Sequence, residues 1–266
     1  MPAARINDID VNYRLEGQGP ETIVLINGLA DDLETWAFQV DDLLAAGYRV
    51  LRFDNRGIGA SSKPAGPYSS RMLADDAKAL VDSLGITDFH LMGVSMGGMI
   101  AQEFAIQHPE KLSRLILGCT SFGGPEAIPP PMEIWKAMLA GPGADEKTRG
   151  LQEQGFFCDE TITNNRAVIA DYLAARSKFP IPPHALALQA DAISKHDTAN
   201  RVGRVQTPTL VITGKDDRLV PPGNSAAIAA RIPGAILKEL PGGHVFMCEY
   251  PIDFNRTVIE FVKSCG

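Results

Sequence analysis

Short apolar segments alternate with amphipathic segments along most of this chain, and the alternation restricts the folds it can adopt. Five runs of aliphatic and β-branched residues precede glycine-bearing loops; they span residues 21–27, 48–54, 88–94, 112–118 and 207–214. Their lack of polar alternation is typical of strands buried on both faces. Apolar residues at helical spacing over 73–84 and 254–262 predict helices with one apolar stripe each. Buried strands separated by such helices predict an α/β fold, with a mostly parallel central sheet and helices on both faces.

The alternation lapses between residues 122 and 205. Proline clusters at 129–131 and 180–183 bracket helical patterns there, without strand-like runs. We therefore expect a helical lid, or cap, at 122–205, inserted into a core made of residues 1–121 and 206–266. Apolar residues make up 45% of the chain, enough for one sizeable core.

Large apolar side chains of the insertion are candidates for a pocket roof. Trp135 and Met138 lie three residues apart on one predicted helix face, and two phenylalanines follow at 156 and 157. Packing explains any one of them more readily than substrate contact, because most helical apolar stripes are core. As a group they predict a largely apolar pocket. The candidate pocket residues are Trp135, Met138, Phe156, Phe157 and Val245.

Charge and composition restrict the classes of molecule that this protein can bind. The chain has 25 Lys and Arg against 32 Asp and Glu, and its net charge of −7 disfavours nucleic acid and anionic membranes. Its start lacks an apolar stretch of signal-peptide length, and no segment approaches the ~20 apolar residues of a membrane span. The four cysteines lack the paired spacing of a zinc or redox motif. We expect a cytoplasmic monomer or homodimer that acts on a small molecule without metal or cofactor.

The segment Gly93-Val94-Ser95-Met96-Gly97-Gly98 follows a predicted strand and precedes a predicted helix. A turn from strand to helix within about two residues strains the backbone at Ser95 and leaves room only for glycine at the flanking positions. The serine hydroxyl then stands at the carboxyl edge of the sheet, beside free N–H groups of the helix N-terminus. The short pattern alone is weak, since a structural turn explains it equally well.

A serine hydroxyl needs a base to take its proton and an acid to orient that base. Of five histidines, His244 lies in a glycine-rich loop after the strand-like segment 235–240, whereas the other four have structural or solvated settings. Asp216 and Asp217 follow another predicted strand, and one of them should orient His244. Turn formation and helix capping are the alternative explanation for both aspartates.

The order serine, acid, histidine along the chain is that of the α/β hydrolases. Five segments resemble signatures of this superfamily in the expected order, over nearly the whole chain except the lid. They are Asn27-Gly28-Leu29, Asp54 to Ser61, Gly93 to Gly98, Gly214 to Pro221 and Gly242 to Pro251.

The resemblance implies roles for particular residues. The pattern Gly-x-x-Asp-x-x-Val-Pro selects Asp217 as the acid, and the backbone N–H groups of Leu29 and Met96 match the family's oxyanion hole. Family members usually carry His-Gly where this chain has Asn27-Gly28, so the expected oxyanion loop departs from the family pattern at this position. We expect Arg56 to be a structural hydrogen-bonding residue.

Two acidic residues, Asp31 and Asp32, adjoin the expected oxyanion loop. We expect both carboxylates to be solvated.

The resemblance implies a serine hydrolase that forms an acyl-enzyme on Ser95, with His244 as base and Asp217 as its orienting acid. Serine at the elbow differs from the aspartate nucleophile of haloalkane dehalogenases and epoxide hydrolases. The chain looks most like the 3-oxoadipate enol-lactonase-type carboxylesterases, so hydrolysis of an ester or lactone is the reaction we expect first. A carbon–carbon bond hydrolase of ring-fission diketones uses the same three residue types, and a ligand receptor or a cofactor-free oxygenase is a further alternative.

Overall fold

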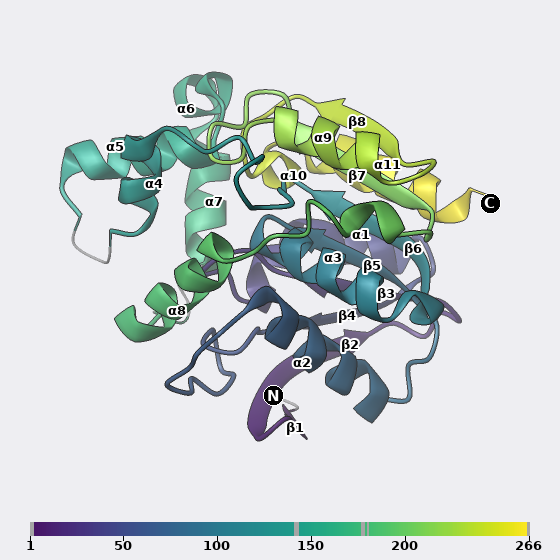
Figure 1. The fold of residues 1–266 in the computed structure, drawn as a ribbon. Helices are drawn as coiled ribbons and strands as arrows, with labels where there is room; N and C mark the ends of the chain where they lie inside the picture. The colour runs from purple at the N-terminus through teal and green to yellow at the C-terminus, as the bar shows by residue number, and fades with distance from the viewer. Residues whose placement is uncertain (1–2, 141–143, 177–178, 180, 265–266) are drawn as a thin grey trace.

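The computed structural model describes residues 3–140, 144–176, 179 and 181–264. Its centre is a sheet of eight strands in the order β1-β2-β4-β3-β5-β6-β7-β8 (Figure 1). The strands are β1 (Ala3–Ile6), β2 (Ile9–Glu16), β3 (Thr22–Ile26), β4 (Arg49–Phe53), β5 (Phe89–Val94), β6 (Leu112–Gly118), β7 (Thr209–Gly214) and β8 (Ile236–Leu240). Neighbouring strands from β4 to β8 are parallel, and β1 and β2 are antiparallel to their neighbours. The expected α/β fold and its five buried strands are confirmed.

The hairpin of β1 and β2 does not follow from the long apolar runs. Ile6 pairs with Ile9 across a two-residue turn in which Asn7 and Asp8 both have positive φ, of 43° and 61°. Asn and Asp tolerate this conformation better than most residues, and tight hairpin turns require it. The alternation of buried Ile9, exposed Asp10 and buried Val11 is the sequence signal for this strand.

Helices cover both faces of the sheet, and successive strand residues contribute to opposite layers. Val24 and Ile26 belong to the apolar layer that contains residues of α2 and α3, whereas Ile23 and Leu25 belong to the layer that contains residues of α1 and α11. Burial of each such side chain stabilises the fold by roughly 1.5–3 kcal/mol. The core helices are α1 (Ala37–Ala45), α2 (Ser70–Ser83), α3 (Met96–Gln107), α9 (Gly223–Arg231), α10 (Phe246–Glu249) and α11 (Pro251–Lys263).

Further helices lie between β6 and β7, and α4, α5 and α6 are set apart from the sheet at the left of Figure 1. These helices are α4 (Met132–Met138), α5 (Glu146–Phe156), α6 (Asp159–Asn164), α7 (Arg166–Arg176) and α8 (Pro183–Ser194). Short 3-10 helices occur at η1 (Leu33–Trp36), η2 (Pro109–Lys111) and η3 (Val202–Arg204). Whether 122–205 behaves as a lid stays a prediction. Within the described ranges, no helix combines the length and hydropathy that crossing a bilayer would require.

Candidate active site

Ser95 occupies a sharp turn between β5 and α3. Its φ of 55° and ψ of −123° are unusual for a residue with a side chain, and such a conformation costs roughly 1–3 kcal/mol. A Cβ on Gly93 would lie 2.2 Å from the carbonyl oxygen of Gly97, and a Cβ on Gly97 would lie 2.1 Å from that of Ile26. Both contacts are with main-chain atoms. The flanking glycines therefore allow β3, β5 and α3 to meet closely behind the serine.

Hydrogen bonds to neighbouring strands hold the strained serine. The Ser95 N–H donates to the carbonyl oxygen of Gly118 at the end of β6, over 2.9 Å. The Ser95 carbonyl oxygen accepts from the Thr120 hydroxyl at 2.7 Å and from the Gly98 N–H at 2.9 Å. The main chain is thus bound on both sides, and the side chain of Ser95 lines a cavity.

His244 and Asp217 form a buried pair beside this cavity. His244 Nδ1 lies 2.8 Å from Asp217 Oδ2, and each residue is 4% exposed. The other carboxylate oxygen accepts the backbone N–H groups of Leu219 and Val220, at 2.9 and 2.8 Å. Asp216, the alternative acid, is exposed. The structure therefore places Asp217 against His244.

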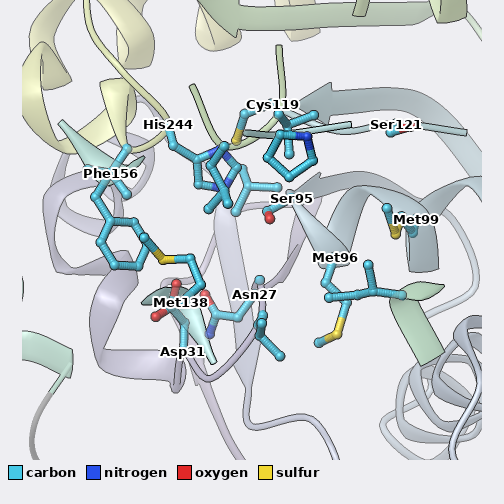
Figure 2. Close-up of a pocket in the computed structure, with 18 of the residues that line it drawn as sticks. Asn27, Asp31, Ser95, Met96, Met99, Cys119, Ser121, Met138, Phe156 and His244 are labelled. Carbon is cyan, nitrogen blue, oxygen red and sulfur yellow. The ribbon is translucent and has the colours of Figure 1, made fainter. Parts of the chain in front are cut away.

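The ends of β5, β7 and β8 bring the three side chains to one edge of the sheet. A Cβ on Gly214, at the end of β7, would lie 2.1 Å from the Gly243 carbonyl oxygen, so the two loops touch through their backbones. Ser95 and His244 both line the cavity, and Figure 2 shows the imidazole next to the Ser95 hydroxyl. Such a grouping can transfer a proton from a nucleophile to a base.

The backbone near Ser95 offers donors for a developing negative charge. Met96 is the first residue of the 12-residue helix α3, where unpaired N–H groups and the helix dipole favour an anion. A Cβ on Gly28 would approach Ser95 Cβ to 3.1 Å, so the loop that carries Leu29 lies directly against the serine. No described residue accepts a hydrogen bond from the Leu29 or Met96 N–H groups.

Asn27 stabilises the expected oxyanion loop from within. Its side chain donates to the Asp32 carbonyl oxygen at 2.7 Å and accepts from the Thr35 hydroxyl at 3.0 Å. The Ala30 N–H donates to Gln189 of α8 over 3.1 Å, and the Gln189 amide in turn donates to the Arg56 carbonyl oxygen. No local sequence pattern could have indicated Gln189, because its partners are distant in the chain. Gln189 thus links the loop at residues 27–35 to the loop that carries Arg56.

Arg56 donates to both carboxylate oxygens of Asp76 in α2 and is mostly buried. The expectation of a structural hydrogen-bonding residue agrees with this contact.

The expectation that Asp31 and Asp32 are solvated is wrong. Asp32 is 3% exposed and accepts the Glu34 N–H at the start of η1; burial raises its pKa to about 6. Asp31 lines the cavity and forms an ion pair with Arg176 Nε at 2.7 Å. Asp32 caps η1, and Asp31 meets Arg176 of α7, a partner that lies far away in the sequence.

The cavity has a volume of about 340 Å³ and is lined mainly by apolar side chains. Among the predicted pocket residues, Trp135, Met138, Phe156 and Val245 line it. The Phe156 ring lies 6.5 Å from the His244 ring, centroid to centroid, and Figure 2 shows Met138 beside the Phe156 ring. These side chains come from α4, α5 and the loop after β8.

The prediction that Phe157 is a pocket residue is wrong, because Phe157 does not line the cavity. It is 1% exposed and packs edge-on against Tyr172 with ring centroids 5.6 Å apart. It follows the end of α5 in extended backbone, and its ring lies 6.3 Å from that of Phe156, centroid to centroid, within the same apolar layer.

Cys119 also lines the cavity, and Figure 2 shows it near His244. Its Sγ and a ligand atom of each partner lie within 4.8 Å of one another. Metal binding would need a thiolate, but burial raises the pKa of Cys119 well above its usual value. Both oxygens of Asp217 also already accept hydrogen bonds. The residues fit a hydrogen-bonded acid–base pair better than a metal site.

Comparison with known proteins agrees with this geometry. The sequence profile described as alpha/beta hydrolase fold matches residues 21–251. This chain belongs to the α/β-hydrolase family. The turn at Ser95 and the His244–Asp217 pair of this α/β hydrolase therefore occur in the setting that the sequence resemblance implied.

Similar proteins carry several hydrolytic activities. A 2-hydroxy-6-oxononadienedioate/2-hydroxy-6-oxononatrienedioate hydrolase from Paraburkholderia xenovorans is 30% identical to this α/β hydrolase, over 96% of this chain and 91% of its own length. The structure of an enol-lactonase from Burkholderia xenovorans matches with a TM-score of 0.88 and 28% identity, covering 99% of this chain and all of the other. A thermophilic esterase from Thermogutta terrifontis, with malate bound, matches with a TM-score of 0.82 and 26% identity, over 96% and 93% of the two chains.

Proposed function

We propose that this α/β hydrolase cleaves carboxylic esters or lactones of small molecules through an acyl-enzyme on Ser95. One observation carries the proposal: a buried imidazole paired to a carboxylate faces the same apolar cavity as a serine held in a strained turn. The similarity to an enol-lactonase and to an esterase supports it.

The hydrogen bond to Asp217 selects the reactive form of the imidazole. When neutral His244 donates its Nδ1–H to Asp217, Nε2 carries a lone pair and accepts the Ser95 proton. Ser95 Oγ then attacks the acyl carbon, and the N–H groups of Met96 and Leu29 stabilise the oxyanion. Protonated His244 gives its proton to the leaving alcohol.

A water molecule completes the cycle. His244 takes a proton from the water as its oxygen attacks the acyl carbon of the ester on Ser95 Oγ. The second tetrahedral intermediate collapses, the proton returns to Ser95, and the carboxylic acid leaves. Asp217 stabilises the transient imidazolium in both halves without becoming protonated.

The direct test is hydrolysis of short-chain p-nitrophenyl esters by wild type and by Ser95→Ala. We expect steady turnover by wild type and a loss of kcat of about 10⁴-fold or more in the variant, because the nucleophile is gone. Ser83→Ala is a matched control, since Ser83 is an exposed residue at the end of α2 and should leave the rate unchanged.

Three results would contradict the proposal. They are full activity of Ser95→Ala, a fluorophosphonate probe that labels another residue, and wild-type reaction that stops after one turnover. The last result would favour a ligand receptor.

Hydrolysis of a carbon–carbon bond in a ring-fission diketone is the second candidate. The Paraburkholderia relative is named for a dienedioate substrate, and Arg176 lines the cavity of this chain, where a cation could bind a substrate carboxylate. Loss of the absorbance of a carboxylated diketone, at a kcat/KM above that for every ester tested, would favour this candidate. We expect no turnover of the carboxylated diketone, because Arg176 already forms an ion pair with Asp31.

A further inference from the structure

Arg176 is the last residue of α7 and supplies the only lysine or arginine side chain among the described residues that line the cavity. Its Nε lies 2.7 Å from Asp31 Oδ1, and its Nη2 donates to the Leu29 carbonyl oxygen at 3.3 Å. The guanidinium also lies 4.8 Å from the ring centroid of Phe156. A carboxylate, a carbonyl oxygen and an aromatic ring thus all contact the guanidinium.

Asp31 balances this cation at the cavity wall. The exposed fractions of the side chains are 16% for Asp31 and 24% for Arg176, so both charges are largely removed from water. The Tyr172 hydroxyl lies 3.5 Å from both carboxylate oxygens of Asp31. Figure 2 shows the Asp31 carboxylate on the side of the cavity where Met138 and Phe156 lie. The wall near the apolar roof therefore carries a closed ion pair with no net charge.

The acidic member of the pair influences groups around it. Burial by itself lowers the pKa of Arg176, and the Asp31 carboxylate, together with Tyr172 and Asp32, more than offsets this effect. Burial raises the pKa of Tyr172 and of Cys248, and the Asp31 charge raises both further. A substrate carboxylate in this part of the cavity would face the Asp31 charge while its expected partner, Arg176, is already bound.

We infer that Asp31 sets substrate specificity: by pairing with Arg176, it makes the site select uncharged acyl substrates and discriminate against analogues that carry a second carboxylate. The inference rests on the proposed ester hydrolysis and names its substrate class. Burying a carboxylate without a partner is strongly unfavourable, and a like charge nearby adds to the cost. The net charge of −7 also disfavours the approach of anions.

Three esters with the same six-carbon acyl chain separate charge from size. Methyl hexanoate and dimethyl adipate are neutral, and monomethyl adipate carries a carboxylate at the far end. With release of acid followed in a pH-stat, we expect wild type to prefer each neutral ester over monomethyl adipate by about a hundredfold in kcat/KM, the scale of one unpaired buried charge.

Asp31→Asn keeps the size of the side chain and releases Arg176 for a substrate carboxylate. We expect the preference for neutral esters to fall at least about tenfold, because a charged hydrogen bond to Arg176 is then available to monomethyl adipate. In the double variant Asp31→Asn with Arg176→Gln, the preference should rise again, since neither charge is left. Asp171→Asn removes the same charge from an exposed position of α7 and should leave the preference unchanged.

The wild-type measurement decides the inference even if a variant does not fold. The inference would be overturned if kcat/KM for monomethyl adipate lay within about threefold of that for dimethyl adipate, because the Asp31–Arg176 pair would then not discriminate against the substrate carboxylate. An unchanged preference in folded Asp31→Asn would overturn it as well. In both cases, hydrolysis of methyl hexanoate that depends on Ser95 would leave the proposed function intact, whereas its absence would refute that function separately.

Discussion

Replacement of Gly97 by alanine tests whether the close approach behind Ser95 positions the reacting groups. The added Cβ would lie 2.1 Å from the Ile26 carbonyl oxygen and 2.7 Å from that of Asn27. Neither is a flexible side-chain atom. To reach an ordinary contact of 3.4 Å, the start of α3 and the end of β3 must separate by about 1.3 Å. This movement changes the relative positions of Leu29 and Met96, the proposed oxyanion donors.

The expected loss follows from that displacement. A misplacement of about 1 Å can lower a rate by about 10²-fold, and loss of one oxyanion donor costs about 10²–10³-fold. We therefore expect Gly97→Ala to lower kcat for a p-nitrophenyl ester by about 10²–10³-fold. The free energy of unfolding should fall by only about 1–3 kcal/mol, the usual cost of overpacking.

The assay combines ester hydrolysis with urea unfolding of wild type, Gly97→Ala and a control. Gly150→Ala, in α5, is matched because its Cβ would have no neighbour within 4 Å. It should leave kcat unchanged and stabilise the protein by roughly 0.5–1 kcal/mol. Wild-type kcat in folded Gly97→Ala would refute the reasoning, since the required displacement would then not affect the chemistry.

Two further variants test the acid and a buried histidine. Asp217→Asn should lower kcat by about 10⁴-fold, because the amide nitrogen favours the wrong tautomer of His244. Stability should change little, since the amide oxygen can still accept the backbone N–H groups of Leu219 and Val220. A tenfold loss of kcat or less in a pH-independent range would exclude this role. Burial lowers the pKa of His196 from 6.5 to about 4, so its stabilising effect is complete above pH 6.5 and is lost as the pH falls toward 4. Between pH 7.5 and pH 4.5 wild type should lose about 2–3 kcal/mol that His196→Gln does not lose, as measured by urea unfolding at each pH; parallel curves for the two proteins would contradict the assignment.

Much of the fold could be predicted because its signals are local. The buried runs that became β3 to β7 are short and apolar on both faces, so they could be recognised without knowing their partners. The β1–β2 hairpin was not predicted, although Ile9, Asp10 and Val11 alternate between buried and exposed, because a half-exposed strand has no continuous apolar run.

The site was predictable only in part. Ser95 and His244 could be identified from glycine-bearing loops after strands, which are local patterns. Phe156 and Phe157 are adjacent in sequence and both pack on Tyr172, yet of the two only Phe156 lines the cavity. The sequence could not distinguish them, because the direction of each side chain depends on where α5 ends against the core.

The amino-acid sequence by itself determined the order of strands and helices and the sharp turn at Ser95, since periodicity and glycine spacing act over a few residues. The family resemblance already selected Asp217 over Asp216, whereas only the tertiary structure decided that Asp31 points inward to Arg176. The physical reason is that burial of a charge is favourable only with a partner, and here the partners come from segments far apart in the chain.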